Sequence, residues 1–283
     1  MLIKIGYNIA LKFAFPTAVI HLLHVHPSRR SDLVEPERFG TYPDLPVEEY
    51  YDKYGNHRGR IYAPAGSVRL FSEAVIRDSG QLDAYAPEAR QLELSEIPTQ
   101  FLEFLLPSRY CEVDSELMDF AWRTFGQTTP GWQRVQAICD FVHSHLRFDY
   151  QKARADRTAL DGFRERVGVC RDFTHLAITL CRCMNIPARY ATGYLGDIGV
   201  PVDPNPMDFS AWFEVFLQGQ WYTFDARHNR RRTGRVLIGL GRDAADVPIT
   251  LAFGKESLEV FRVLTEEIVD FAAASDAPTA KAA

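Results

Sequence analysis

The first part of the chain, up to about residue 80, alternates hydrophobic and polar residues in short runs. Ile3, Ile5, Tyr7 and Ile9 lie two residues apart, which is the spacing of one face of a β-strand. Further apolar runs at residues 18–25, 60–63 and 68–76 are separated by clusters of Pro, Gly, Asn and Asp. Because short strands divided by turn residues are typical of antiparallel sheets, this region is predicted to form a β-sandwich.

A helical period replaces the alternation in the second half of the chain. Residues 115–125 and 131–146 carry apolar residues at three- and four-residue spacing, and so does the run from Phe173 to Met184. These segments are predicted to be helices that each bury one face. Asn185 and Pro187 end the third helix, and residues 188–195 are predicted to form a strand.

Two clear strands follow, at residues 209–217 and 220–226, with Gln218 and Gly219 between them. A two-residue turn there pairs Leu217 with Gln220, so paired residue numbers sum to 437. Alternation then gives a core face and an opposite face. The core face carries Phe209, Ala211, Phe213, Val215, Tyr222 and Phe224, and the other carries Ser210, Trp212, Glu214, Thr223, Asp225 and Arg227. A carboxylate at Asp225 requires a partner, for which Arg227 and Arg189 are candidates.

Composition narrows the class of protein. The 283 residues are 46% hydrophobic, enough for two domains or one large one, and the net charge of -5 with mixed signs excludes a nucleic-acid-binding surface. Five cysteines at irregular spacing exclude a disulfide framework and favour a reducing compartment. Lys4, Asn8, Lys12 and Pro16 interrupt the apolar N-terminus, so we expect a cytoplasmic protein without a membrane span.

Cys170 stands out among the cysteines by its position. It follows Gly168 and precedes the apolar stripe of the third helix, whereas Cys181 lies on that stripe and Cys183 lies deep in the helix. A thiol in the first helical turn is close to unpaired backbone N–H groups and to the positive end of the helix dipole. These conditions lower a thiol pKa and favour a nucleophilic thiolate, so Cys170 is the candidate nucleophile.

A group of three histidines, His21, His24 and His26, raises the question of a metal site. On a strand only His24 and His26 share a face, and no carboxylate or cysteine lies nearby in the sequence. We therefore predict no metal site from this group.

Four motifs, GVCRDF, IPARYATGY, AWFEV and WYTFDA, together resemble the bacterial transglutaminase-like superfamily of cysteine enzymes over roughly residues 113–230. The resemblance implies an α+β fold in which a papain-like core of helices and antiparallel sheet follows a β-sandwich domain. The expected organisation is a sandwich at residues 1–95, a connector at 96–112, a catalytic core at 113–271 and a disordered tail at 272–283.

Carried over to this sequence, the resemblance implies that Cys170 is the nucleophile and Asp225 the aspartate that orients the base. The histidine of the HAW form of the motif is replaced by Ser210. A serine hydroxyl cannot act as the base near neutral pH. Either His228 replaces it, which requires a turn or bulge after Ala226, or the site is impaired and the protein is a binding or assembly module. Trp212, Tyr194 and Ser210 are the candidate substrate-binding residues.

The leading hypothesis is a cysteine enzyme that acts on the amide bond of a peptide or protein, by hydrolysis or by acyl transfer through a thioester. Hydrolysis is favoured because no acceptor-amine site is evident. Ligation of a metal by Cys170 with histidines is the third alternative, and no ligand spacing supports it. We expect no cofactor, and no EF-hand spacing implies calcium.

Overall fold

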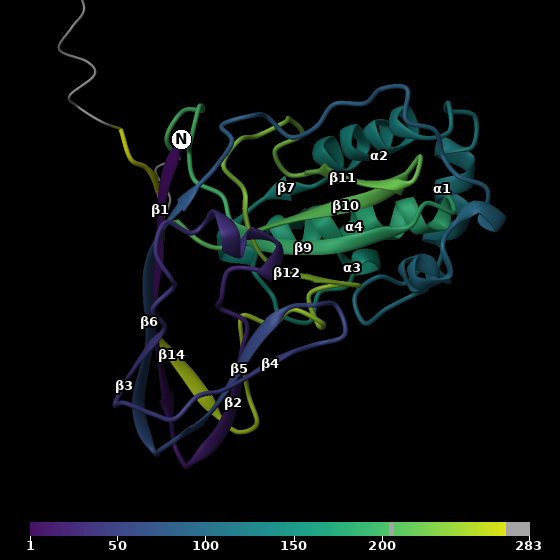
Figure 1. Ribbon diagram of the computed structural model, residues 1–283. Helices are drawn as coiled ribbons and strands as arrows, with labels where there is room; N and C mark the ends of the chain where they lie inside the picture. Colours follow the sequence, from purple (N-terminus) through teal and green to yellow (C-terminus); the bar gives the residue numbers. More distant parts are fainter. Residues whose placement is uncertain (204–206, 270–283) are drawn as a thin grey trace, which may run out of the picture.

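The computed structural model describes residues 1–203 and 207–269. Within them lie three four-stranded antiparallel sheets, a short parallel pair of strands and four α-helices. Two of the sheets form the left and lower part of the molecule in Figure 1, and the third sheet lies with the helices at the upper right. No helix in the described part of the chain is long and apolar enough to cross a membrane.

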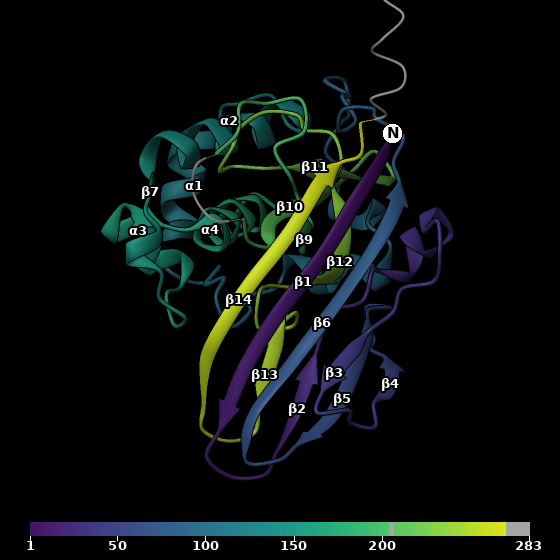
Figure 2. The same ribbon diagram turned by 90° about the vertical axis from the view of Figure 1, so that its left-hand side faces the viewer.

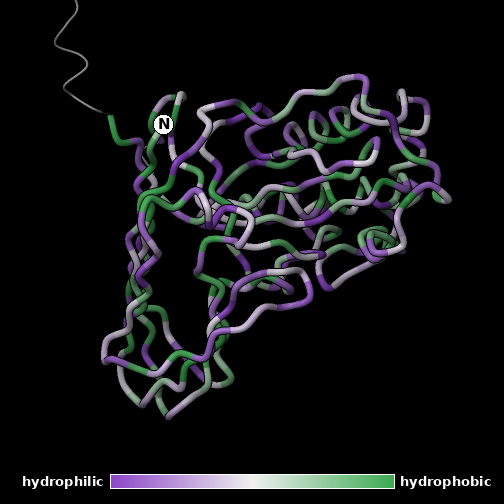
Figure 3. Tube along the Cα trace, viewed as in Figure 1, coloured by the Kyte–Doolittle hydropathy of each residue, from purple (hydrophilic) through white to green (hydrophobic). Residues whose placement is uncertain are grey.

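The two lower sheets are built mostly from the N-terminal residues. One sheet has the order β14 (Glu256–Glu267), β1 (Leu2–Phe13), β6 (Gly66–Arg77) and β3 (Gly40–Tyr42). The other has the order β13 (Thr250–Ala252), β2 (Thr17–His21), β5 (His57–Ala63) and β4 (Glu48–Tyr51). Hydrophobic and polar residues alternate along the long strands (Figure 3), and their inward residues share one core with the rest of the chain.

C-terminal strands complete both of these sheets. β14 pairs with β1 along most of its length, and β13 pairs with β2. Figure 2 shows β14, β1 and β6 side by side. The sequence analysis placed residues 113–271 in the catalytic core, but β13 and β14 belong to the N-terminal sheets. The sequence could not show this, because alternation within a strand does not specify its partner. The predicted disordered tail at 272–283 lies outside the described residues.

The third sheet, with the helices, forms the region predicted to be the core. Its order is β11 (Gln220–Phe224), β10 (Ser210–Leu217), β9 (Ala188–Tyr194) and β12 (Val236–Gly241). Helix α4 (Cys170–Cys183) packs against β9 and β10 and contacts the other helices (Figure 1). These are α1 (Leu117–Phe125), α2 (Trp132–His145) and α3 (Ala159–Glu165). The arrangement confirms the predicted α+β fold.

Short elements connect these units. The parallel pair is β7 (Arg147–Phe148) with β8 (Val167–Gly168), which leads into α4. The 3₁₀ helices among the described residues are η1 (Pro27–Asp32), η2 (Leu94–Glu96), η3 (Thr99–Leu105) and η4 (Tyr150–Lys152). The predicted connector at 96–112 contains η3.

The hairpin of β10 and β11 has the predicted register. Leu217 pairs with Gln220 and Phe213 with Phe224, so the numbers sum to 437. Gln218 and Gly219 both have positive φ, at 48° and 88°, as a two-residue hairpin turn requires. The predicted core face is buried.

A buried arginine holds the C-terminal end of α4 in place. Arg182 is 1% exposed, and its guanidinium donates to the carbonyl oxygens of Ala188, Leu106 and Arg242 at 2.6–3.1 Å. It also donates to the Ser108 hydroxyl at 3.1 Å. One side chain therefore joins the helix to β9, to the connector and to the residue that follows β12.

Replacing Arg182 with methionine removes these donors and leaves buried carbonyl oxygens without partners. Because each unpaired buried group costs about 1–3 kcal/mol, we expect Arg182→Met to lower the free energy of unfolding by several kcal/mol in urea denaturation. The matched control is Arg164→Met, because Arg164 is 59% exposed and bonds only to Glu116 among the described residues. Its loss should cost no more than about 0.5 kcal/mol. Equal losses in the two variants would contradict the structural role of Arg182.

Candidate active site

Cys170 is the first residue of α4, and the turn before it is closed by Asp172. Asp172 Oδ2 accepts a hydrogen bond from the Val169 backbone N–H at 2.9 Å and one from Arg157 Nη1 at 3.1 Å. A carboxylate in this position satisfies a free N–H group at the helix start and complements the helix dipole. The salt bridge with Arg157 balances its charge, since both side chains are buried.

Gly168 is required by this cap. A Cβ atom at residue 168 would lie 2.6 Å from Cβ and 2.7 Å from Oδ2 of Asp172. The glycine of the GVCRDF motif therefore makes room for the capping carboxylate, and Cys170 is placed by that cap.

A cavity of about 140 Å³ is lined by several residues that interact with Cys170, although Cys170 itself is not among its lining residues. Its polar lining includes Tyr150, Asp208, Ser210, Arg227 and His228. Of these, Tyr150, Asp208 and Arg227 interact electrostatically with the Cys170 thiol. The cavity is thus bounded by the segment before α3, the start of β10 and the turn after β11.

The chain turns immediately after β11, and this turn brings His228 to Asp225. Asp225 Oδ1 accepts from the His228 backbone N–H at 3.0 Å, and Oδ2 lies 2.9 Å from His228 Nδ1. Residues 226–228 form the turn, so the strand does not continue to place His228 on the opposite face. The structure therefore contains the turn that the His228 hypothesis required.

Arg235 supplies the charge that balances Asp225. Its Nη2 lies 3.0 Å from Asp225 Oδ2. Burial alone would raise the pKa of Asp225, but Arg235 and the hydrogen bonds from His228 lower it below its ordinary value. An ionised Asp225 accepts a hydrogen bond from His228 Nδ1–H, which leaves Nε2 of a neutral imidazole as the acceptor.

The Cys170 thiol has a raised pKa, in contrast to the lowering that the sequence predicted. Burial is the main cause, and it raises the pKa to about 11 together with the negative charge of Asp208. Arg227 and the Ala211 backbone N–H act in the opposite direction. The loss of hydration on burial therefore raises the pKa of Cys170 by more than Arg227 and the Ala211 N–H lower it. The resting thiol is neutral near pH 7.

The other predicted site residues are placed differently. Ser210 lines the cavity, and its hydroxyl is buried without a hydrogen-bond partner among the described residues. Trp212 lies on the same sheet face as Ser210 but farther along β10, where it packs with Ala191 and Leu240. Tyr194 is buried in the core against Phe209. Neither Trp212 nor Tyr194 lines the cavity, because each side chain is held in a packed cluster of its own.

Sequence reasoning did not find Tyr150, Asp208 and Arg235. The partners proposed for Asp225 were Arg227 and Arg189, but Arg189 pairs with Glu214 and Arg227 lies 3.7 Å from Asp203. The only sequence signal for Arg235 is the basic run that precedes β12. Asp208 lies two residues before the Ser210 position, which was a usable signal for a group near the site.

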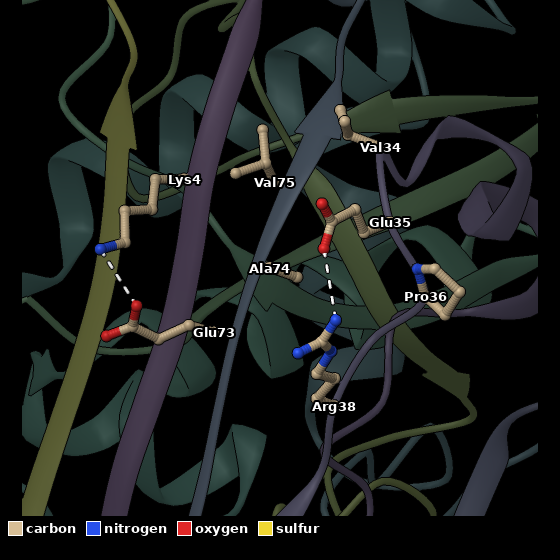
Figure 4. A pocket seen from close by; sticks show the side chains of 8 residues that line it. All are labelled: Lys4, Val34, Glu35, Pro36, Arg38, Glu73, Ala74 and Val75. Carbon is tan, nitrogen blue, oxygen red and sulfur yellow. Dashed lines mark ion pairs between the residues drawn. The ribbon is translucent and has the colours of Figure 1, made fainter.

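A larger cavity, of about 350 Å³, lies beside β1 and β6 (Figure 4). Its charged residues pair with one another: Lys4 with Glu73 at 3.1 Å, and Arg38 with Glu35 at 3.7 Å. Because these charges are satisfied at an exposed surface and no candidate nucleophile lines the cavity, we place the candidate active site at Cys170 instead.

The charge of Asp208 should control the reactivity of Cys170. Burial raises the pKa of Asp208 to about 6, so it is mostly ionised above that pH and disfavours the thiolate. We expect Asp208→Asn to lower the pKa of Cys170 and to increase its alkylation by iodoacetamide several-fold at pH 8. The two rate profiles should converge below pH 6, where Asp208 is protonated in the parent. A slower reaction in the variant would contradict this electrostatic effect.

Comparison with known proteins identifies relatives of this chain. Residues 119–226 match the family model described as the transglutaminase-like superfamily. An uncharacterized protein of Mycobacterium leprae is 25% identical over 223 residues, which cover 74% of this chain and 77% of that protein. An uncharacterized protein of Mycobacterium tuberculosis is 28% identical over 159 residues, which cover 52% of this chain and 49% of that protein.

The crystal structure of a Cytophaga hutchinsonii protein, named a "putative cysteine protease", superposes with a TM-score of 0.82. The two sequences are 30% identical, and the match covers 96% of this chain and 92% of that one. The match includes the N-terminal sheets as well as the helical region. This chain therefore belongs to the transglutaminase-like superfamily.

Proposed function

We propose that the chain is a cysteine hydrolase that cleaves an amide bond of a peptide or protein. In this proposal Cys170 is the nucleophile, His228 the general base and Asp225 the residue that orients His228. The observation that carries it is the hydrogen bond of 2.9 Å between His228 Nδ1 and Asp225 Oδ2, in a turn that also lines the cavity beside Cys170. Similarity to the Cytophaga protein, named a "putative cysteine protease", supports it.

The first half of the reaction forms a thioester. His228 Nε2 takes the Cys170 proton as sulfur attacks the carbonyl carbon of the amide. The resulting imidazolium then donates that proton to the leaving amine as the carbon–nitrogen bond breaks. Asp225 stabilises the imidazolium, because it is ionised and remains paired with Arg235.

The second half releases the acid. His228 Nε2 takes a proton from water, whose oxygen attacks the thioester carbonyl. The carbon–sulfur bond then breaks, and the imidazolium returns the proton to sulfur, which regenerates the thiol and the neutral imidazole. The backbone N–H of Cys170 is available at the helix start to stabilise the oxyanion. Water is the proposed acceptor, because no site for an amine acceptor is evident in the described part of the chain.

Two observations favour a second candidate, a binding or assembly module that has lost activity. Ser210 occupies the histidine position of the family motif, and burial raises the pKa of Cys170. On that alternative the His228 and Asp225 pair only fixes the turn after β11. The two candidates differ in whether His228 changes the chemistry of Cys170.

We propose a cytoplasmic location, as the composition suggested. All five cysteines are free thiols, and four of them are buried. A reducing compartment maintains free thiols. Its proposed partners are peptide or protein amides, and we propose no nucleic-acid or membrane partner.

The test measures acylation and alkylation of Cys170. The parent should form a thioester with a p-nitrophenyl ester, detected by mass spectrometry on the peptide that contains Cys170. In His228→Ala we expect the acylation rate at pH 7 to fall about 10²–10⁴-fold, because the base is lost. Iodoacetamide alkylation from pH 5 to 9 should slow at neutral pH in the same variant.

The control is His145→Ala. His145 donates to the Phe163 carbonyl oxygen at 2.7 Å and stacks on Phe163, so it does not line the cavity. The His145→Ala protein should be acylated at the rate of the parent. Identical rates in the parent and in His228→Ala would reject the base role and favour the binding module.

A further inference from the structure

A second polar cluster lies in the N-terminal sheets, away from Cys170. His24, Glu49 and His57 line one cavity of about 740 Å³. They come from the segment after β2, from β4 and from the start of β5. One ligand atom of each lies within 4.8 Å of those of the other two. We call these three residues the histidine cluster.

The tautomer of His24 is set by a carboxylate behind it. Glu37 Oε2 lies 3.3 Å from His24 Nδ1 and accepts from the Val25 backbone N–H at 3.1 Å. An ionised Glu37 needs a donor at Nδ1, so His24 carries its proton there. In the neutral ring Nε2 is therefore a bare acceptor.

His24 Nε2 faces a negative group without a bond. The side chain is 5% exposed, and Nε2 has no hydrogen-bond partner among the described residues. Glu49 Oε1 lies 3.9 Å from this Nε2 atom. A buried lone pair that faces a carboxylate is unfavourable. A cation between His24 Nε2 and Glu49 would remove this repulsion.

His57 presents its own Nε2 to the same carboxylate, at 3.0 Å from Glu49 Oε2. The rings of His24 and His57 are stacked at 4.2 Å with 21° between their planes. Both Nε2 atoms therefore approach Glu49 from one side. A cation between them would require only rotation of the two rings and of Glu49, whose side chain is 53% exposed.

From this geometry we propose that His24, His57 and Glu49 bind one divalent transition-metal ion of the zinc class. Two imidazoles and one carboxylate suit Zn²⁺, Co²⁺ or Ni²⁺, whereas Ca²⁺ and Mg²⁺ prefer oxygen ligands. Glu37 orients His24 from behind, as partners of metal-bound histidines commonly do. The cavity leaves room for a further ligand on the ion.

Arg30 opposes binding and provides a sharp test. Its Nη2 donates to His57 Nδ1 at 3.0 Å, so the His57 proton lies on Nε2 and points at Glu49. A metal ion that binds Nε2 has to displace that proton, and the ring then carries its proton on Nδ1. Arg30 donates to Nδ1, so its side chain has to move away when the ion binds. Arg30 is an exposed residue of η1 and is free to swing into solvent.

The sequence did not indicate this site, because the carboxylate and the second histidine are distant along the chain. Of His21, His24 and His26, only His24 belongs to the cluster, while Glu49 and His57 lie 25 and 33 residues beyond it. The pairing of β4 with β5, which places Tyr51 opposite His57, brings Glu49 close to that histidine.

The experiment uses the full chain carrying Cys170→Ala, which removes the one partly buried cysteine of the described residues as a competing ligand. After dialysis against a chelator, the protein is titrated with Zn²⁺ by calorimetry and with Co²⁺ by visible absorption. We expect one ion per chain. Glu49→Gln and His57→Gln should each weaken binding at least about tenfold, and Glu37→Gln about 10–100-fold. Arg30→Ala should strengthen it.

His143→Gln is the matched control, because His143 is an exposed histidine that bonds to the Arg227 carbonyl oxygen. It should leave zinc affinity unchanged. Circular dichroism confirms that each variant is folded, and the exposed Glu49 makes Glu49→Gln the safest substitution. The absence of a saturable site in the Cys170→Ala chain would overturn the proposal. So would binding that Glu49→Gln leaves unchanged.

Discussion

The candidate active site depends on the neutralisation of one buried carboxylate, that of Asp225. Taking a lone carboxylate out of water costs several kcal/mol, so the charge has to be paired. Arg235 provides the pairing, and Arg235 Nε in turn bonds to both carboxylate oxygens of Asp83 at 3.0–3.1 Å. Asp83 Oδ2 also accepts from the Arg232 backbone N–H at 2.9 Å. The requirement to pair Asp225 thus fixes the loop from β11 to β12, and His228 with it.

The N-terminal sheets are continuous with the site rather than an appended domain. β14 returns from the C-terminal part of the chain to pair with β1, and its Thr265 carbonyl oxygen would lie 2.5 Å from a Cβ atom at Gly196. Arg232 Nη2 donates to the Gly196 carbonyl oxygen at 2.7 Å. Residues 195 and 197, on either side of this glycine, line the cavity beside Cys170. The end of β14 therefore supports one wall of that cavity.

Local sequence patterns predicted those features of the fold that depend on residues close together along the chain. The hairpin register followed from alternation and from Gln218 and Gly219, since a two-residue turn fixes every later pair. Helix α4 followed from its apolar stripe. The return of β13 and β14 and the salt bridge of Asp225 with Arg235 were not predictable, because the partners are separated in the sequence and no local signal connects them. The histidine cluster was missed for the same reason.

The raised pKa of Cys170 constrains how the proposed reaction begins. A permanent thiolate and imidazolium pair would require the surroundings to stabilise the anion, but burial and Asp208 oppose it. The thiol is then neutral in the resting protein, and proton transfer to His228 has to accompany attack on the substrate. Such a thiol is less open to oxidation, since the thiolate is the reactive form. The barrier to the proposed attack is then higher, because the thiol proton has to be removed in the same step.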